Sequence, residues 1–165
     1  MSTQPENQVG LFHITYNIAQ KLAGQPLLGA PHLRLDILVD TVNKTITGVS
    51  HIFQSTSPPV NVISQITGEW SYMCTMDSCN ILVIADGFDF SSILVGGHPV
   101  EHKNVKLRMS LSDDWQSGFA NFSYLHAGKW HEVDAATVEI IEYSTQKNIE
   151  KLATLTSANK PKVAA

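Results

Sequence analysis

The sequence predicts an all-β fold: an antiparallel β-sandwich, with a closed β-barrel as the alternative, followed by a short C-terminal helix or tail. Apolar and polar residues alternate in segment after segment, which is the two-residue period of a half-buried strand. Clusters of turn-forming residues separate these segments at short intervals. Only 16% of the 165 residues are charged, while Thr, Ser, Val and Ile are frequent, and those side chains suit a pleated surface.

The individual strands follow from the same alternation. Leu33 and Leu35 begin the clearest alternating segment, and Asn43 lies in the turn that follows it, so residues 32–54 are predicted to form a hairpin. The apolar run 81–85 contains no polar residue and indicates a strand that is buried on both faces. The predicted strands cover residues 9–18, 32–40, 45–54, 60–70, 81–85, 105–111, 119–125 and 130–143.

The remaining segments are expected to be irregular or helical. Residues 86–104 are rich in glycine and are predicted to form the longest irregular loop, and long loops are often functional. Residues 1–8 are expected to be a flexible N-terminus and 9–143 the β-domain. Residues 144–165 are expected to form a short helix and a disordered tail.

Local patterns do not separate a sandwich from a barrel. The segments around Pro59 and Gly97 resemble edges and crossovers rather than uniform hairpins, which favours the sandwich. In a barrel with a polar lumen, four polar residues on the alternating strands would line a ligand cavity, whereas in a sandwich they would be solvated. These cavity candidates are Arg34, Asp36, His51 and Arg108.

Composition and chain pattern restrict the expected partners and location. The formal net charge of -4 lacks the basic excess of nucleic-acid-binding proteins. Residues 1–8 are polar and do not resemble a signal peptide, and no apolar stretch is long enough to predict a membrane span. We therefore expect no nucleic-acid or membrane partner and a cytoplasmic location, although export by a specialised machinery would leave no mark in the sequence.

The chain contains two cysteines, which are too few for a disulfide framework. Cys74 and Cys79 are not spaced as Cys-x-x-Cys, and no second pair completes a zinc site. Two buried or half-buried thiols near a turn are the favoured interpretation. A local disulfide is the alternative, and it would require an oxidising compartment.

Few residues suggest a ligand site, and none suggests catalysis. The seven histidines show no spacing that places two imidazoles on one face of an element, so no metal and no cofactor is predicted. His98 and His102 belong to the irregular loop region and are ligand-binding candidates. No nucleophile motif is present, and no catalytic residue is predicted.

Adjacent carboxylates beside an indole form the other candidate. Asp113 and Asp114 could bind sugar hydroxyls or a cation while Trp115 stacks on a sugar ring. The favoured interpretation is a turn in which the aspartates cap backbone N–H groups and Trp115 covers the edge of the core.

Several segments resemble domain-of-unknown-function family 1842, a family of small bacterial proteins. The resemblance covers about residues 9–142 and implies a bacterial source and a compact β-domain, but no activity. The segments that carry it are residues 10–16, 35–41 with 47–48, 57–60, 72–76, 107–111 leading to 113–118, and 128–133.

The sequence identifies no specific function. A non-enzymatic binding or protein-interaction module is the leading hypothesis, with an unknown protein, a second copy of the chain or, less favoured, a carbohydrate as partner. The alternative is a barrel-type small-ligand binding protein or small enzyme with a polar cavity.

Overall fold

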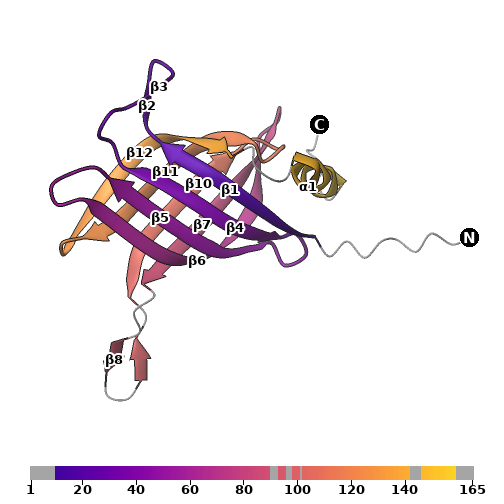
Figure 1. Cartoon of the computed structure of the whole chain (residues 1–165). Helices are drawn as coiled ribbons and strands as arrows, with labels where there is room; N and C mark the ends of the chain where they lie inside the picture. The colour runs from indigo at the N-terminus through magenta and orange to yellow at the C-terminus, as the bar shows by residue number, and fades with distance from the viewer. Residues whose placement is uncertain (1–9, 90–92, 96–97, 101, 142–145, 159–165) are drawn as a thin grey trace, which may run out of the picture.

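Eight strands form a closed antiparallel barrel in the computed structural model, which describes residues 10–89, 93–95, 98–100, 102–141 and 146–158 (Figure 1). The order around the barrel is β1-β12-β11-β10-β7-β6-β5-β4, and two short hairpins, β2-β3 and β8-β9, stand outside it. The strands are β1 (Leu11–Ala19), β2 (Lys21–Leu22), β3 (Gln25–Pro26), β4 (His32–Asp40), β5 (Thr45–Gln54), β6 (Val60–Cys74), β7 (Cys79–Asp89), β8 (Ile93–Val95), β9 (His98–Val100), β10 (Lys103–Leu111), β11 (Ser117–His126) and β12 (Lys129–Ile140).

The barrel closes because the first strand pairs with the last. Asn17 of β1 is paired with Arg34 of β4 on one side and with Glu139 of β12 on the other. Closure removes the unpaired edges that an open sheet would expose. The all-β prediction and its barrel alternative are therefore confirmed, and the favoured sandwich is not.

Apolar side chains fill the interior of the barrel, so the polar lumen considered for the barrel alternative is not found among the described residues. Leu33 and Leu35 point inward and are fully buried, whereas Arg34 between them is exposed. The same alternation places Arg108 in solvent, and leaves Asp36 and His51 half-buried on the outer wall. An eight-stranded barrel is just wide enough for inward side chains to fill it, and here they are almost all hydrophobic.

Two local predictions need correction. The run 81–85 alternates in the structure, because Ile81 and Val83 are fully buried while Ile84 is 50% exposed on the outer wall. The predicted irregular loop 86–104 is largely strand: β7 continues to Asp89, and β8 pairs with β9 as a hairpin.

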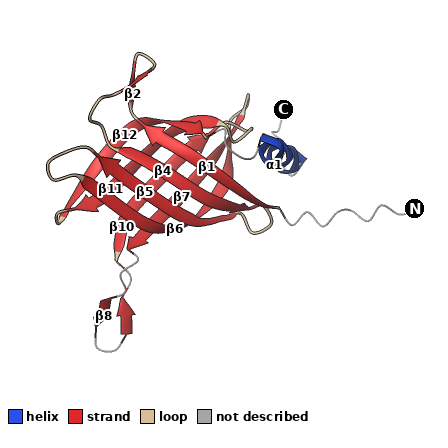
Figure 2. Cartoon of the chain, viewed as in Figure 1, coloured by secondary structure: helices blue, strands red, loops and turns tan. Residues whose placement is uncertain are grey.

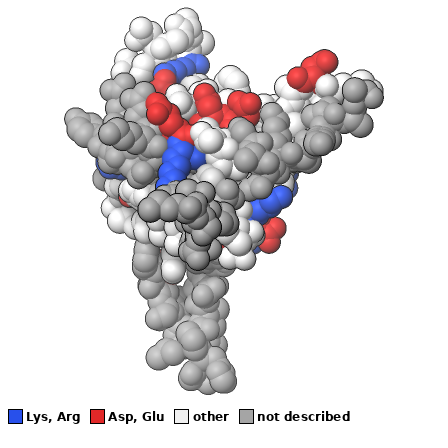
Figure 3. Space-filling model, turned by 90° about the vertical axis from the view of Figure 1, so that its right-hand side faces the viewer, with Lys and Arg blue, Asp and Glu red and all other residues white. Residues whose placement is uncertain are grey.

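A helix closes one end of the barrel, as the sequence predicts for this region (Figure 2). Helix α1 (Gln146–Ala158) buries Leu152 completely against the core. Thr156 fixes the helix to the barrel, since its carbonyl accepts a hydrogen bond from the Tyr72 hydroxyl and its Oγ1 accepts one from Trp115 Nε1 at 3.3 Å. The view toward this end shows acidic and basic side chains close to one another (Figure 3). Over the described ranges, the molecule has no helix long and apolar enough to cross a membrane.

Cys74 and Cys79 form a disulfide, so the favoured interpretation of two thiols is wrong. The two cysteines are directly opposite each other, at the end of β6 and the beginning of β7, on either side of the connecting turn. Cys74 is exposed, and Cys79 is buried. The bond therefore closes this hairpin covalently and links an exposed residue to a buried one.

Candidate binding groove on the outer wall

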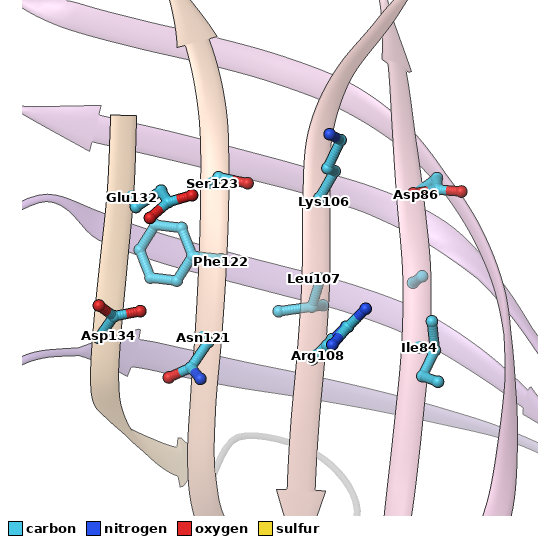
Figure 4. Close-up of a pocket in the computed structure, with 11 residues that line it drawn as sticks. Ile84, Asp86, Lys106, Leu107, Arg108, Asn121, Phe122, Ser123, Glu132 and Asp134 are labelled. Atoms are coloured by element: carbon cyan, nitrogen blue, oxygen red, sulfur yellow. The ribbon is translucent and has the colours of Figure 1, made fainter. Parts of the chain in front are cut away.

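An open groove of about 300 Å³ lies on the outer wall, over strands β7, β10, β11 and β12 (Figure 4). Strand register sets its first row of side chains. Asp86 of β7 is paired with Lys106 of β10. Lys106 is in turn paired with Ser123 of β11, and Ser123 with Glu132 of β12. The row therefore crosses all four strands at one level of the barrel.

A second row lies two residues further along each strand. Ile84 is paired with Arg108, and Arg108 with Asn121. A bulge follows, because Asp134 and Ala135 of β12 together face Asn121. Ala135 has a positive φ of 53°, and its N–H donates to Asn121 Oδ1 at 2.8 Å. The side chain of Asn121 thus satisfies the bulge and fixes where the Asp134 carboxylate emerges.

Some charges in the groove have a partner within the described chain, and others have none there. Asp86 forms an ion pair with Lys103 at 3.1 Å, and the Lys106 ammonium lies 4.7 Å from the centre of the Trp130 ring. The side chains of Arg108, Glu132 and Asp134 make no hydrogen bond or ion pair with the rest of the described chain. All three are exposed, so water satisfies them and a ligand can replace that water.

Apolar side chains continue the groove along the wall. A hollow of about 230 Å³ shares Arg108 and Asn121 with it and is bordered by Leu82 and Phe119. Phe119 is 64% exposed, and Ile84 is 50% exposed. Exposed apolar side chains that are surrounded by polar groups are typical of interaction surfaces.

The Asp113–Trp115 segment forms the capped turn of the favoured interpretation. Asp114 Oδ1 accepts a hydrogen bond from the Gln116 N–H at 3.1 Å. Trp115 is fully buried, and its carbonyl accepts a hydrogen bond from the Tyr16 hydroxyl at 2.6 Å. Burial, with a smaller contribution from the charge of Asp114, raises the pKa of Tyr16 above its ordinary range. Trp115 therefore has no exposed face on which a sugar could stack, although Asp113 and Asp114 remain exposed.

The histidine candidates do not join this turn. His102 is exposed, and its carbonyl accepts a hydrogen bond from the Asp89 N–H at 2.8 Å. His98 lies in β9 opposite Val95, and its side chain lies outside the described residues. The nine residues of β10, about 30 Å of extended chain, separate His102 from the Asp113 turn. Within the described ranges, no group of three metal-ligating side chains is present.

A few buried polar groups interrupt the apolar interior. Ser64 is fully buried, and its hydroxyl donates to Asn104 Oδ1 at 2.6 Å. Ser50 is 1% exposed, and its hydroxyl has no hydrogen-bond partner within the described part of the chain. These groups lie among packed side chains and do not line a described cavity, so they do not restore the cavity hypothesis.

Comparison with known proteins supports the resemblance seen in the sequence. The family model for a domain of unknown function, DUF1842, matches residues 9–130. This chain belongs to the DUF1842 family. The matched region contains β1 through β11 and ends at Trp130, two residues into the strand that closes this DUF1842 barrel. No similar protein was found among the curated proteins.

Sequence reasoning missed most of the groove. It selected Arg108, but as a residue of an internal cavity, and it did not select Lys106, Glu132 or Asp134. The signal that could have identified them is the outward position of each residue on an alternating strand. The rows, however, also depend on strand register and on the bulge at Asn121, which local sequence does not define.

Proposed function

We propose that this DUF1842 domain is a non-enzymatic binding module that engages a protein partner through the outer groove. One observation carries the proposal: Arg108, Glu132 and Asp134, whose side chains make no hydrogen bond or ion pair within the described chain, line one groove with the exposed Ile84. The exposed Phe119 borders the adjoining hollow, which shares Arg108. Arginine and aromatic side chains dominate the binding energy of many protein interfaces, and surrounding polar groups provide specificity.

The filled interior supports a site on the outer wall. Inward side chains such as Ile37, Leu107 and Val138 are at most 1% exposed, so the hydrophobic core occupies the interior of the barrel. A partner would therefore meet the wall itself, where the charged rows and the apolar side chains are accessible.

A protein partner fits this groove better than a carbohydrate. Sugar sites usually present an exposed aromatic ring on which the sugar stacks. The aromatic residue that lines the groove itself, Phe122, is only 2% exposed, whereas the 64% exposed Phe119 borders the adjoining hollow. The Trp130 ring nearby is covered on one face by Lys106. Extended rows of both charge signs instead match a surface that also carries both signs.

Site-specific photocrosslinking tests the proposal. A benzoylphenylalanine replacing Phe119, in cells that naturally express the chain, should form a discrete protein adduct. The matched control replaces Val49, which is 41% exposed on the outer wall of β5. The Phe119 adduct should disappear in the Arg108→Glu background. Equal adducts from both positions, or none from Phe119, would refute the proposal.

A further inference from the structure

Resting on the proposed function, we infer that the protein partner is a second copy of this chain. The two copies would meet face to face through β10, β11 and β12, related by a two-fold axis that runs parallel to β11. The inference depends on how the charges are distributed over these three strands.

The charges on this face are segregated by strand. β10 presents Lys106 and Arg108 outward, and β12 presents Glu132 and Asp134. β11 lies between them, so the basic and acidic strands are about 10 Å apart. No ion pair between β10 and β12 is found in the described chain, so Arg108, Glu132 and Asp134 are available to another molecule. The Lys106 ammonium lies over the Trp130 ring of β12 and would leave that ring to pair with Glu132 of a second copy.

A two-fold axis along β11 brings these sets together. Rotation about that axis exchanges the two sides of β11 and keeps the level along the strand, so β10 of one copy faces β12 of the other. Arg108 and Asp134 lie at one level, beside Asn121. Lys106 and Glu132 lie at the next level, on either side of Ser123. Each copy would therefore place Arg108 against Asp134, and Lys106 against Glu132, of its twin.

The side chains on the axis are compatible with meeting themselves. A residue on a two-fold axis faces its own symmetry mate, so a charge there would be repelled. The outward positions of β11 within the face are Phe119, Asn121 and Ser123, and none is charged. Phe119, 64% exposed, would pack against the Phe119 ring of the second copy and bury an apolar surface that the monomer leaves in water.

Charge reversal and exchange test this arrangement. Sedimentation velocity of the purified full chain should give a species of twice the 18.1 kDa chain mass, and the dimer should weaken as salt is raised. Arg108→Asp and Asp134→Arg should each raise the dimer Kd by at least about tenfold, because each places like charges opposite one another. The double exchange should restore the Kd to within about threefold of the original.

The control is Arg34→Asp, an exposed charge reversal on β4, which lies across the barrel from β10. It should leave the Kd unchanged, and circular dichroism should show that all variants fold. A monomeric wild-type chain, or a double exchange that fails to recover the dimer, would overturn the inference. A Phe119 crosslink to a different protein would then still support the proposed function, whereas the absence of any Phe119 crosslink would refute the proposed function itself.

Discussion

The inner and outer faces of β7, β10 and β11 differ in both chemistry and exposure. Inward, these strands present Val83, Leu107 and Phe122, each at most 2% exposed. Outward, the adjacent residues include Ile84 and Arg108, which are exposed, and the Arg108 side chain makes no hydrogen bond or ion pair within the described chain. Adjacent residues of one strand therefore have different roles. The inner residues stabilise the barrel, and the outer residues are accessible to another molecule.

The two faces should respond very differently to the loss of a tryptophan. Trp115 is fully buried and packs edge-on against Trp70, with ring centroids 5.1 Å apart. Trp115→Ala should lower the free energy of unfolding by about 3–5 kcal/mol, because it leaves a large cavity under α1. Denaturant unfolding followed by far-ultraviolet circular dichroism measures the change.

Trp130→Ala is the matched variant on the outer wall. Trp130 is 42% exposed, and the Lys106 ammonium lies 4.7 Å from the centre of its ring. We expect a loss below about 1 kcal/mol. Similar losses for the two tryptophans would contradict the assignment of stability to the inner face.

The disulfide offers a second test, because it stabilises the fold by a covalent bond at the end of a hairpin. Replacing both Cys74 and Cys79 with alanine should lower the free energy of unfolding by about 2 kcal/mol, the amount expected for a short closed loop. Thermal unfolding with and without reductant measures the effect. Reductant should lower the stability of the wild-type chain and leave the double variant unchanged; a wild-type chain insensitive to reductant would show that the bond contributes nothing.

The sequence predicts the inner face better than the outer one. The bounds of β4 and β5 match the prediction, since strict alternation marks each inward residue and turn residues mark each end. β7 is less well predicted because its outward residues Leu82 and Ile84 are also apolar, which hides the alternation.

Barrel closure and the groove depend on pairing between distant segments. Ile18 and Val138 are 120 positions apart in the chain and still pair directly, and no local pattern specifies that contact. Trp115 is fully buried with a positive φ of 65°, a backbone conformation that the alternation of apolar residues does not predict. The groove combines residues from four strands, so it appears only once the register is known.

Two buried serines differ in hydrogen bonding, and their alanine variants should therefore differ in the free energy of unfolding. Ser64→Ala should cost about 1–3 kcal/mol, because it leaves the buried Asn104 Oδ1 without its donor. Ser50→Ala should be neutral or stabilising by up to about 1 kcal/mol, since the hydroxyl that it removes is buried without a partner. Equilibrium unfolding of both variants measures the difference, and a destabilised Ser50→Ala variant would show that this hydroxyl does bond in solution.

The smallest effect is expected in the exposed turn between β4 and β5. Hydrogen bonds from the backbone N–H and side-chain amide of Asn43, and from the Val42 N–H, hold the pKa of Asp40 below its ordinary value. The charged carboxylate therefore stabilises the fold above about pH 4, and this contribution is lost as pH falls through the lowered pKa. Asp40→Asn should consequently differ from wild type more at pH 7 than at pH 3 in thermal unfolding. Val42→Ala keeps the carboxylate and its backbone donors, so its difference from wild type should not change with pH. If the Asp40→Asn difference is equally independent of pH, the turn depends on the shape of this side chain and not on its charge.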